Sequence, residues 1–284
     1  MIYDFRNLRP EPTYPIYPPY HTGKYLEDFI FEYYKNHRED FDKSGRTMIP
    51  VSWTTLYVQG TEHNIQDYLN VLPPDNAYWT CSQHDDGIRH GLPPNTLHFA
   101  AGGLGGGIPI PLICSPIPEN LKTSSMGDFE KNIFCSFIGS QTHPIRKKLF
   151  DTYVNNPNFS FNPPKQWSQT VNAHECASFF QATQLSNFSL APRGYGLSSF
   201  RLYEIMQLNS IPVYVSDRHW LPFTDELNWN EFCVIVKEEE IPNLENILKS
   251  ISKERQDKML ARGKEVWNSH FSMESTCKQI AHRL

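Results

Sequence analysis

The sequence predicts an α/β protein whose second half contains a parallel β-sheet. From residue 132 onward, short apolar runs typical of buried strands alternate with stretches of helical spacing, the pattern of successive strand–helix–strand units. Before this alternation, residues 115–131 are polar and carry several prolines and serines, as segments between domains do. The 284 residues suffice for one large domain or two small ones. We therefore expect two domains, residues 1–120 and residues 121–284.

The first half is expected to combine two helices with several short strands. Residues 1–20 are rich in proline and tyrosine and indicate an extended lead-in. Apolar residues at helical spacing predict helices within residues 22–37 and residues 65–72. The expected strands, some with their exits, are residues 47–59, 78–82, 97–100 and 112–115.

The run "GGLGGG", residues 102–107, leaves two interpretations open. Glycine-rich loops cradle phosphates when a Lys-Ser/Thr pair and a helix follow. Neither follows here, because the next segment is a short strand interrupted by proline. A flexible loop over a cleft therefore fits this run better than a phosphate cradle.

The second half predicts a regular alternation of strands and helices. Pro144 lies in the first turn of one predicted helix, a position that tolerates proline. We expect the last helix of the chain to pack back on the first domain. The predicted strands are residues 132–139, 188–191, 211–215 and 232–236, and the predicted helices are residues 143–154, 198–208, 244–251 and 254–270.

Composition excludes several classes of function. A formal net charge of −5 argues against a nucleic-acid partner, because phosphate backbones require a basic surface. No run approaches the roughly 18 apolar residues that span a bilayer, and the first ten residues hold no signal-peptide core. The six cysteines form no CxxC pair, so no zinc site or disulfide framework is indicated. We expect a soluble, cytoplasmic protein without a membrane anchor.

The stretch "APRGYGLSSFRLYE", residues 191–204, predicts an anion site. A strand ends at residue 191 and a helix begins near Ser198 and Ser199, so the turn between them lies where parallel sheets bind ligands. The start of the helix offers unpaired N–H groups, and Gly194 allows close approach to the backbone. With Arg193 and Arg201 beside it, this turn suits a diphosphate.

Glu204 lies one turn further along the same predicted helix. A carboxylate there could accept two hydrogen bonds from a ribose diol. A simple surface pair between Arg201 and Glu204 explains the same spacing and would be worth only a few tenths of a kcal/mol. The nucleotide site is preferred because the chemistry of the whole turn agrees with it.

A second junction, "SFIGSQTHPIR", repeats the same logic. Gly139 and Ser140 leave a predicted strand, and Arg146 lies in the helix that follows. Two such junctions in one sheet could hold one diphosphate from two sides.

With these residues in place, residues 133–251 resemble the exostosin domain of glycosyltransferase family 47. The motifs that carry the resemblance occur in matching order: F-x-G…R, P-R-G, S-x-R with a following Glu, P-V-x-x-S-D, and L-P-F…W. The first half is similar mainly at "QHDDG", residues 83–87. The chain also resembles short members without a membrane anchor that large algal viruses encode, which would place it in a host cytoplasm.

The resemblance implies a GT-B fold of two Rossmann-like domains facing across a cleft. It also implies an inverting transferase that moves a sugar from a UDP-sugar to a hydroxyl of a glycan acceptor, with no metal or other cofactor. Arg146 and Arg193 would bind the diphosphate. Gly139, Ser140, Gly194, Ser198, Ser199 and Arg201 would support it, and Glu204 would hold the ribose. The one D-x-D run, residues 40–42, is expected to face solvent.

Inversion requires a general base that takes the proton of the acceptor hydroxyl. Asp85, with His84 beside it, is the candidate because it follows a predicted strand of the acceptor-side domain. An aspartate in an ordinary turn explains this position equally well.

The identity of the donor sugar is not fixed by any residue. No additional cation for a uronate carboxylate is evident, which favours a neutral sugar, xylose first. The alternative is a catalytically inactive carbohydrate- or nucleotide-binding relative of the same fold. The presence of Arg193, Arg201 and Glu204 together counts against that alternative.

Overall fold

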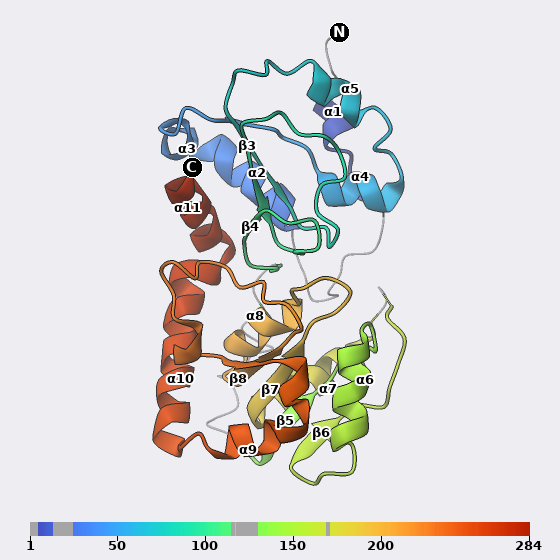
Figure 1. The fold of residues 1–284 in the computed structure, drawn as a ribbon, viewed down its shortest axis with the longest axis vertical. Coiled ribbons are helices and arrows are strands. Elements are labelled where there is room, and N and C mark those ends of the chain that lie inside the picture. Colours follow the sequence, from blue (N-terminus) through green and yellow to red (C-terminus); the bar gives the residue numbers. More distant parts are fainter. Residues whose placement is uncertain (1–4, 14–24, 115–116, 118–129, 169–170) are drawn as a thin grey trace.

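The computed structural model describes residues 5–13, 25–114, 117, 130–168 and 171–284, and within these it contains two parallel β-sheets (Figure 1). The first sheet has the order β1-β2-β3-β4 and the second β6-β5-β7-β8-β9, with every neighbouring pair parallel. Two α/β units thus face each other across a cavity, which confirms the predicted fold class. The predicted boundary near residue 120 lies outside the described residues and stays a prediction.

The first unit surrounds its short sheet with helices from the same half of the chain. The strands are β1 (Thr47–Met48), β2 (Tyr78–Ser82), β3 (Thr96–Ala100) and β4 (Ile108–Pro109). The helices are α1 (Phe5–Leu8), α2 (Leu26–Asn36), α3 (Arg38–Asp42), α4 (Trp53–Gln59) and α5 (Ile65–Asn70).

The second unit alternates strands and helices as the sequence predicts, and it also contains a strand at residues 159–161 and helices at residues 173–184 and 273–283 that were not predicted. The strands are β5 (Ile133–Phe137), β6 (Phe159–Phe161), β7 (Ser186–Pro192), β8 (Ile211–Val215) and β9 (Val234–Val236). The helices are α6 (Pro144–Tyr153), α7 (Ala173–Gln184), α8 (Phe200–Gln207), α9 (Leu244–Lys249), α10 (Lys253–Val266) and α11 (Met273–Arg283).

Three strand predictions need correction. Within residues 47–59 only Thr47–Met48 pairs in the sheet, because Pro50 cannot donate to a strand ladder, and residues Trp53–Gln59 form a helix instead. Residues 112–114 are buried without forming a strand, and the edge of the sheet is Ile108–Pro109 instead. The strand predicted over residues 232–236 begins at Val234, because a short 3-10 turn (Trp229–Glu231) precedes it.

The strand order of the second sheet determines where a ligand can bind. Strand β5 lies between β6 and β7, so the chain leaves β5 in one direction and returns on its other side at β7. The crevice at the carboxyl ends of two such strands is the usual ligand site of open parallel sheets. The loops after β5 and β7, residues 138–143 and 193–199, border this crevice.

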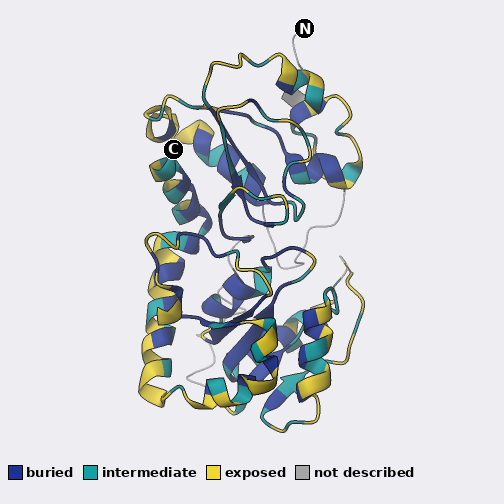
Figure 2. Cartoon of the chain, viewed as in Figure 1, coloured by how far each residue is buried: buried dark blue, intermediate teal, exposed yellow. Residues whose placement is uncertain are grey.

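The end of the chain crosses from the second unit back to the first. Helix α10 packs against α8 and β8, the chain bends at a π turn (Trp267–Phe271), and α11 packs against α2 and α3 (Figure 1). One apolar cluster accordingly contains Ile30 of α2 together with Ile280 of α11. Figure 2 shows the burial of each residue, with buried strands at the centre and exposed residues along the outer side of α10.

We predict that Ile280→Ala lowers the free energy of unfolding by about 2–5 kcal/mol, because the fully buried side chain leaves a cavity between α11 and α2. Urea denaturation followed by circular dichroism measures the change. The exposed neighbour Lys278→Ala is the control and should leave the unfolding midpoint almost unchanged. Equal midpoints for the wild type and Ile280→Ala would contradict the packing of Ile280 in the core between α11 and α2.

Candidate functional site

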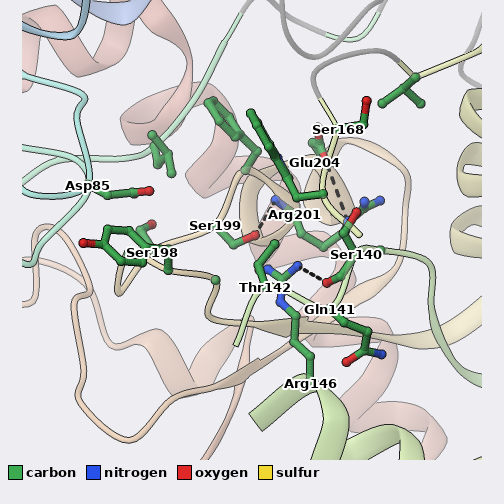
Figure 3. A pocket seen from close by; sticks show the side chains of 18 of the residues that line it. Asp85, Ser140, Gln141, Thr142, Arg146, Ser168, Ser198, Ser199, Arg201 and Glu204 are labelled. Carbon is green, nitrogen blue, oxygen red and sulfur yellow. Dashed lines mark hydrogen bonds and ion pairs between the residues drawn. The ribbon is translucent and has the colours of Figure 1, made fainter. Parts of the chain in front are cut away.

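A cavity of about 740 Å³ lies between the two units, within the size range of small-molecule sites. Both halves of the chain contribute to its lining (Figure 3). Ten of the eleven predicted site residues line it: His84, Asp85, Gly139, Ser140, Arg146, Gly194, Ser198, Ser199, Arg201 and Glu204. Arg193 is the exception.

The junction between β7 and α8 presents the start of a helix to the cavity. Ser199 has an extended backbone, and its side chain accepts a hydrogen bond from the N–H of Arg201 at 3.3 Å, which caps α8. The neighbouring Ser198 is 3% exposed, and its buried hydroxyl interacts with that of Tyr203. The cavity-facing start of α8 therefore combines the positive end of a helix dipole with a buried hydroxyl group that a ligand could bind.

Arg146 connects the two junctions that border the crevice. From the first turn of α6 its guanidinium donates to the carbonyl oxygens of Ser140 at 2.8 Å, Arg193 at 2.9 Å and Pro192 at 3.0 Å. The side chain is buried, with its Cζ 5.5 Å from the centroid of the Phe137 ring. Arg146 lines the cavity, and these bonds also hold the two loops in register.

Arg193 itself does not line the cavity, and its guanidinium is already paired with other groups of the protein. Its Nη1 lies 2.5 Å from Asp217 Oδ1, and its Nη2 donates to the carbonyl oxygen of Tyr195 at 2.9 Å. Burial alone would raise the pKa of Asp217, but the hydrogen bond and charge of Arg193 lower it below its ordinary value. Arg193 stabilises the turn, and its predicted contact with a diphosphate would require this pair to open.

Arg201 and Glu204 form a pair, but the pair is largely buried. The guanidinium of Arg201 lies 3.5 Å from the ring centroid of Phe179, and its Nε lies 3.8 Å from Glu204 Oε2. Arg201 Nη1 is buried and has no hydrogen-bond partner within the described part of the chain. Leaving such a donor unpaired costs about 1–3 kcal/mol or more. A bound anion would offset this cost, which is a stronger reason for a ligand than the spacing of the two residues.

Asp85 reaches across the boundary between the units. Burial, together with the charge of Asp86, raises its pKa to about 6, although the Arg193 charge and the N–H of Gly196 act in the opposite direction. The rise of about two pKa units corresponds to on the order of 3 kcal/mol against the ionised form. A carboxyl group held at this cost beside a cavity is a candidate for proton transfer.

His84 is neutral in this environment. Burial and the charge of Arg89 lower its pKa, and its Nδ1 accepts a hydrogen bond from the N–H of Asp86 at 3.2 Å. Its Nδ1 also lies 3.9 Å from Asp86 Oδ2, but a ring nitrogen that accepts from an N–H carries no proton for an ion pair. His84 therefore lines the cavity as an uncharged ring beside Asp85.

The glycine-rich run supports the turn that carries Asp85. The N–H of Leu104 donates to the carbonyl oxygen of Asp85 at 3.0 Å. A Cβ on Gly102 would overlap the backbone of Asp85, and a Cβ on Gly196 would overlap its carboxylate. None of residues 102–107 lines the cavity, so this run forms neither a phosphate cradle nor a covering loop in the lining of that site. The glycines allow close packing of backbone segments.

Sequence reasoning missed Glu27, a buried carboxyl group beneath the Asp85 turn. It accepts hydrogen bonds from the N–H of Gln83 at 2.6 Å and from Thr54 N–H and Oγ1 at 3.0 and 2.6 Å. Burial raises its pKa to about 7 against the effect of these bonds. Its position on the buried face of α2, three residues before Ile30, was a detectable signal in the sequence.

The D-x-D run lies away from the cavity. Asp40 and Asp42 are exposed on α3, where they pair with Lys43 at 3.7 Å and Arg38 at 4.0 Å. In the described ranges no three His, Cys, Asp or Glu side chains gather in a metal-binding group. In the same ranges no helix has the length and apolar character to cross a membrane.

Comparisons with known proteins identify one family and several relatives. The exostosin GT47 domain matches residues 97–251, which is more than half of the chain. A probable glycosyltransferase of Arabidopsis thaliana is 25% identical over 304 aligned residues, covering 97% of this chain and 52% of that protein. A second one from the same plant is 34% identical over 224 residues, covering 68% of this chain and 44% of that protein.

Two further similarities are more limited in extent. A probable glucuronosyltransferase of Oryza sativa subsp. japonica is 34% identical over 113 residues, covering 40% of this chain and 24% of that protein. A solved structure also aligns with this chain: the C-terminal domain of a glycosyl transferase group 1 family protein from Francisella tularensis. The alignment covers 49% of this chain and 86% of that domain, with a TM-score of 0.33 and 11% sequence identity. That likeness is too remote to locate any residue.

The chain spans about half the length, or less, of the curated relatives that it matches. The matched residues 97–251 include the loops after β5 and β7, which line the cavity. The protein belongs to the exostosin GT47 domain family.

Proposed function

We propose that this protein is an inverting, metal-independent glycosyltransferase that transfers a sugar from a UDP-sugar to a hydroxyl of a glycan acceptor. The observation that carries the proposal is the pairing of two features in one cavity. The start of α8 with the unpaired Nη1 of Arg201 comes from one unit, and Asp85 with its raised pKa comes from the other. The cavity thus offers both a binding site for the anionic diphosphate of the donor and a general base for the acceptor hydroxyl.

The diphosphate of the donor would lie at the start of α8. Arg201 Nη1 is a buried donor without a hydrogen-bond partner among the described residues, Ser198 supplies a buried hydroxyl, and both residues line the cavity. Phosphate oxygens satisfy such donors, and the helix dipole adds to the attraction. As the sugar leaves, negative charge grows on the diphosphate, and the same groups stabilise it in the transition state.

Asp85 would accept the proton of the acceptor hydroxyl. The acceptor oxygen forms a bond to the anomeric carbon while the bond from that carbon to the diphosphate breaks, and UDP leaves with the bonding electrons. The proton passes to the carboxylate, whose pKa of about 6 keeps it ionised at neutral pH and yet basic enough to be useful. Glu204 would hold the ribose, as the sequence resemblance implies.

A neutral donor sugar, xylose first, remains the proposal. The rice relatives named as probable glucuronosyltransferases raise a uronate as the competing choice. Besides Arg146 and Arg201, the described lining contains Lys165, and its Nζ is already paired with Glu175 at 2.7 Å. A uronate carboxylate would have to compete with Glu175 for this cation. The likeness to algal-virus members and a place in a host cytoplasm remain expectations from the sequence.

The alternative is an inactive relative that binds a sugar or nucleotide without transferring it. A binding protein has no need of a carboxyl group kept at a raised pKa beside the ligand. Release of UDP from a UDP-sugar panel separates the two possibilities.

We predict that Arg201→Ala weakens UDP binding at least tenfold, because a buried guanidinium that meets the diphosphate is lost. Isothermal calorimetry with UDP measures the change. Arg255→Ala, which removes an exposed guanidinium on α10, is the matched control and should bind UDP like the wild type. Unchanged affinity in Arg201→Ala would remove this residue from the donor site.

We predict that Asp85→Asn lowers kcat/KM by about 10²–10⁴-fold while UDP affinity stays within twofold of the wild type. The amide keeps the shape of the side chain and can still accept from the N–H of Gly196, but it cannot take a proton. Steady-state kinetics of UDP release, together with calorimetry, test both parts. Retained turnover in Asp85→Asn would exclude Asp85 as the base.

We predict that the wild-type kcat/KM falls about tenfold per pH unit below pH 6, as Asp85 becomes protonated. The charge of Asp86 raises the pKa of Asp85, so Asp86→Asn should lower that pKa and shift the acidic limb to lower pH. The pH profiles of the wild type and of Asp86→Asn, measured in one buffer series, provide the comparison. An acidic limb that does not move in Asp86→Asn would assign it to another group.

A further inference from the structure

Trp167 is half-exposed although it lines the cavity. Its exposed fraction is 51%, which is unusual for the largest apolar side chain. Of the five large apolar side chains that are exposed in the described ranges, three line this cavity: Val58, Trp167 and Tyr195. Exposed apolar side chains concentrated at one cavity indicate a ligand with flat or apolar faces.

The segment that carries Trp167 is attached to the same strand ends as the rest of the site. It follows β6, the neighbour of β5, so it leaves the sheet at the same edge. Asn162 Oδ1 accepts from the N–H of Gly139 at 2.8 Å, and the carbonyl oxygen of Lys165 accepts from the N–H of Gln141 at 2.9 Å. The ion pair of Lys165 with Glu175 connects the segment to α7. These bonds fix the chain two residues before Trp167.

The ends of the cavity are distinct. Figure 3 shows Asp85 on one side of the pocket and Ser168 on the opposite side, with Ser199 and Arg201 between them. In a nucleoside diphosphate sugar the diphosphate separates the sugar from the nucleoside. If the diphosphate lies at the start of α8 and the sugar reaches toward Asp85, the nucleoside extends toward residues 165–168.

We infer that Trp167 is the stacking platform for the nucleobase of the donor, an inference that rests on the proposed function. The ring supplies a wide flat surface next to solvent, and a base that covers it removes apolar area from water on both partners. Stacking of one base on an aromatic side chain is worth enough to change affinity about tenfold or more. The contact also positions the donor along the cavity, with its sugar at the end where Asp85 lies.

The test compares UDP with inorganic pyrophosphate, a probe that lacks the nucleoside. Trp167→Ala should weaken UDP binding about tenfold and leave pyrophosphate binding unchanged, whereas Trp167→Phe should keep UDP affinity within about threefold. Calorimetry measures UDP, and competition against UDP measures pyrophosphate. Val71→Ala, which truncates an apolar side chain 62% exposed and outside the cavity lining, is the matched control.

Tryptophan fluorescence gives an independent readout. Trp53, Trp79, Trp229 and Trp267 are buried and Trp220 is half-buried, so Trp167 is the exposed indole of this chain. UDP should quench the emission of the wild type, and the quench should disappear in Trp167→Phe while UDP still binds by calorimetry.

Each contrary outcome has its own meaning. Equal UDP affinity in Trp167→Ala and the wild type overturns the stacking contact and leaves the proposed function intact. A parallel loss of pyrophosphate binding in Trp167→Ala also overturns it, because the effect would then not be specific to the base. A wild-type protein that binds pyrophosphate but not UDP refutes the nucleotide donor itself, and the inference with it.

Discussion

The site depends on the guanidinium of Arg146, which joins two loops that are far apart in the sequence. Its three hydrogen bonds go to backbone carbonyl oxygens of Ser140, Pro192 and Arg193, and bonds from a charged donor are worth about 1.5–3 kcal/mol each. Because the acceptors are backbone atoms, the arginine fixes the path of both loops. The start of α8, the turn of Gly196 and the contact with Asp85 all follow from that path.

The contact between the two units depends equally on small residues. Asp85 can approach the second unit only because Gly102 and Gly196 have no side chain in its way. Tyr195, between the glycines of the turn, donates from its hydroxyl to Asp86 Oδ1 at 2.9 Å, a second link across the boundary. The carboxyl group of Asp85 is thereby enclosed by protein from both units. This enclosure removes it from water and accounts for its raised pKa.

Much of the fold could be predicted from the sequence, because buried strands of a parallel sheet are continuous apolar runs. Strands β2 and β8 begin and end at the predicted residues, and every residue in them is buried. Strand β6 has only three residues and gave no such signal. The β-branched Thr54, Thr55 and Val58 favoured a strand where helix α4 forms, since local preference yields to tertiary packing. The direction of the Arg193 side chain could not be predicted either, because the sequence does not show that Asp217 is its partner.

The packing of α11 on α2 has a consequence for motion. The chain passes between the two units twice, once between β4 and β5 and again between α10 and α11, and the second passage is anchored in the apolar core of the first unit. The same apolar cluster also contains residues of both units away from these crossings, among them Trp79 and Tyr203, so the units share one core. A movement that opened the cavity by separating the units would expose this shared core to water, which opposes a wide opening of the site.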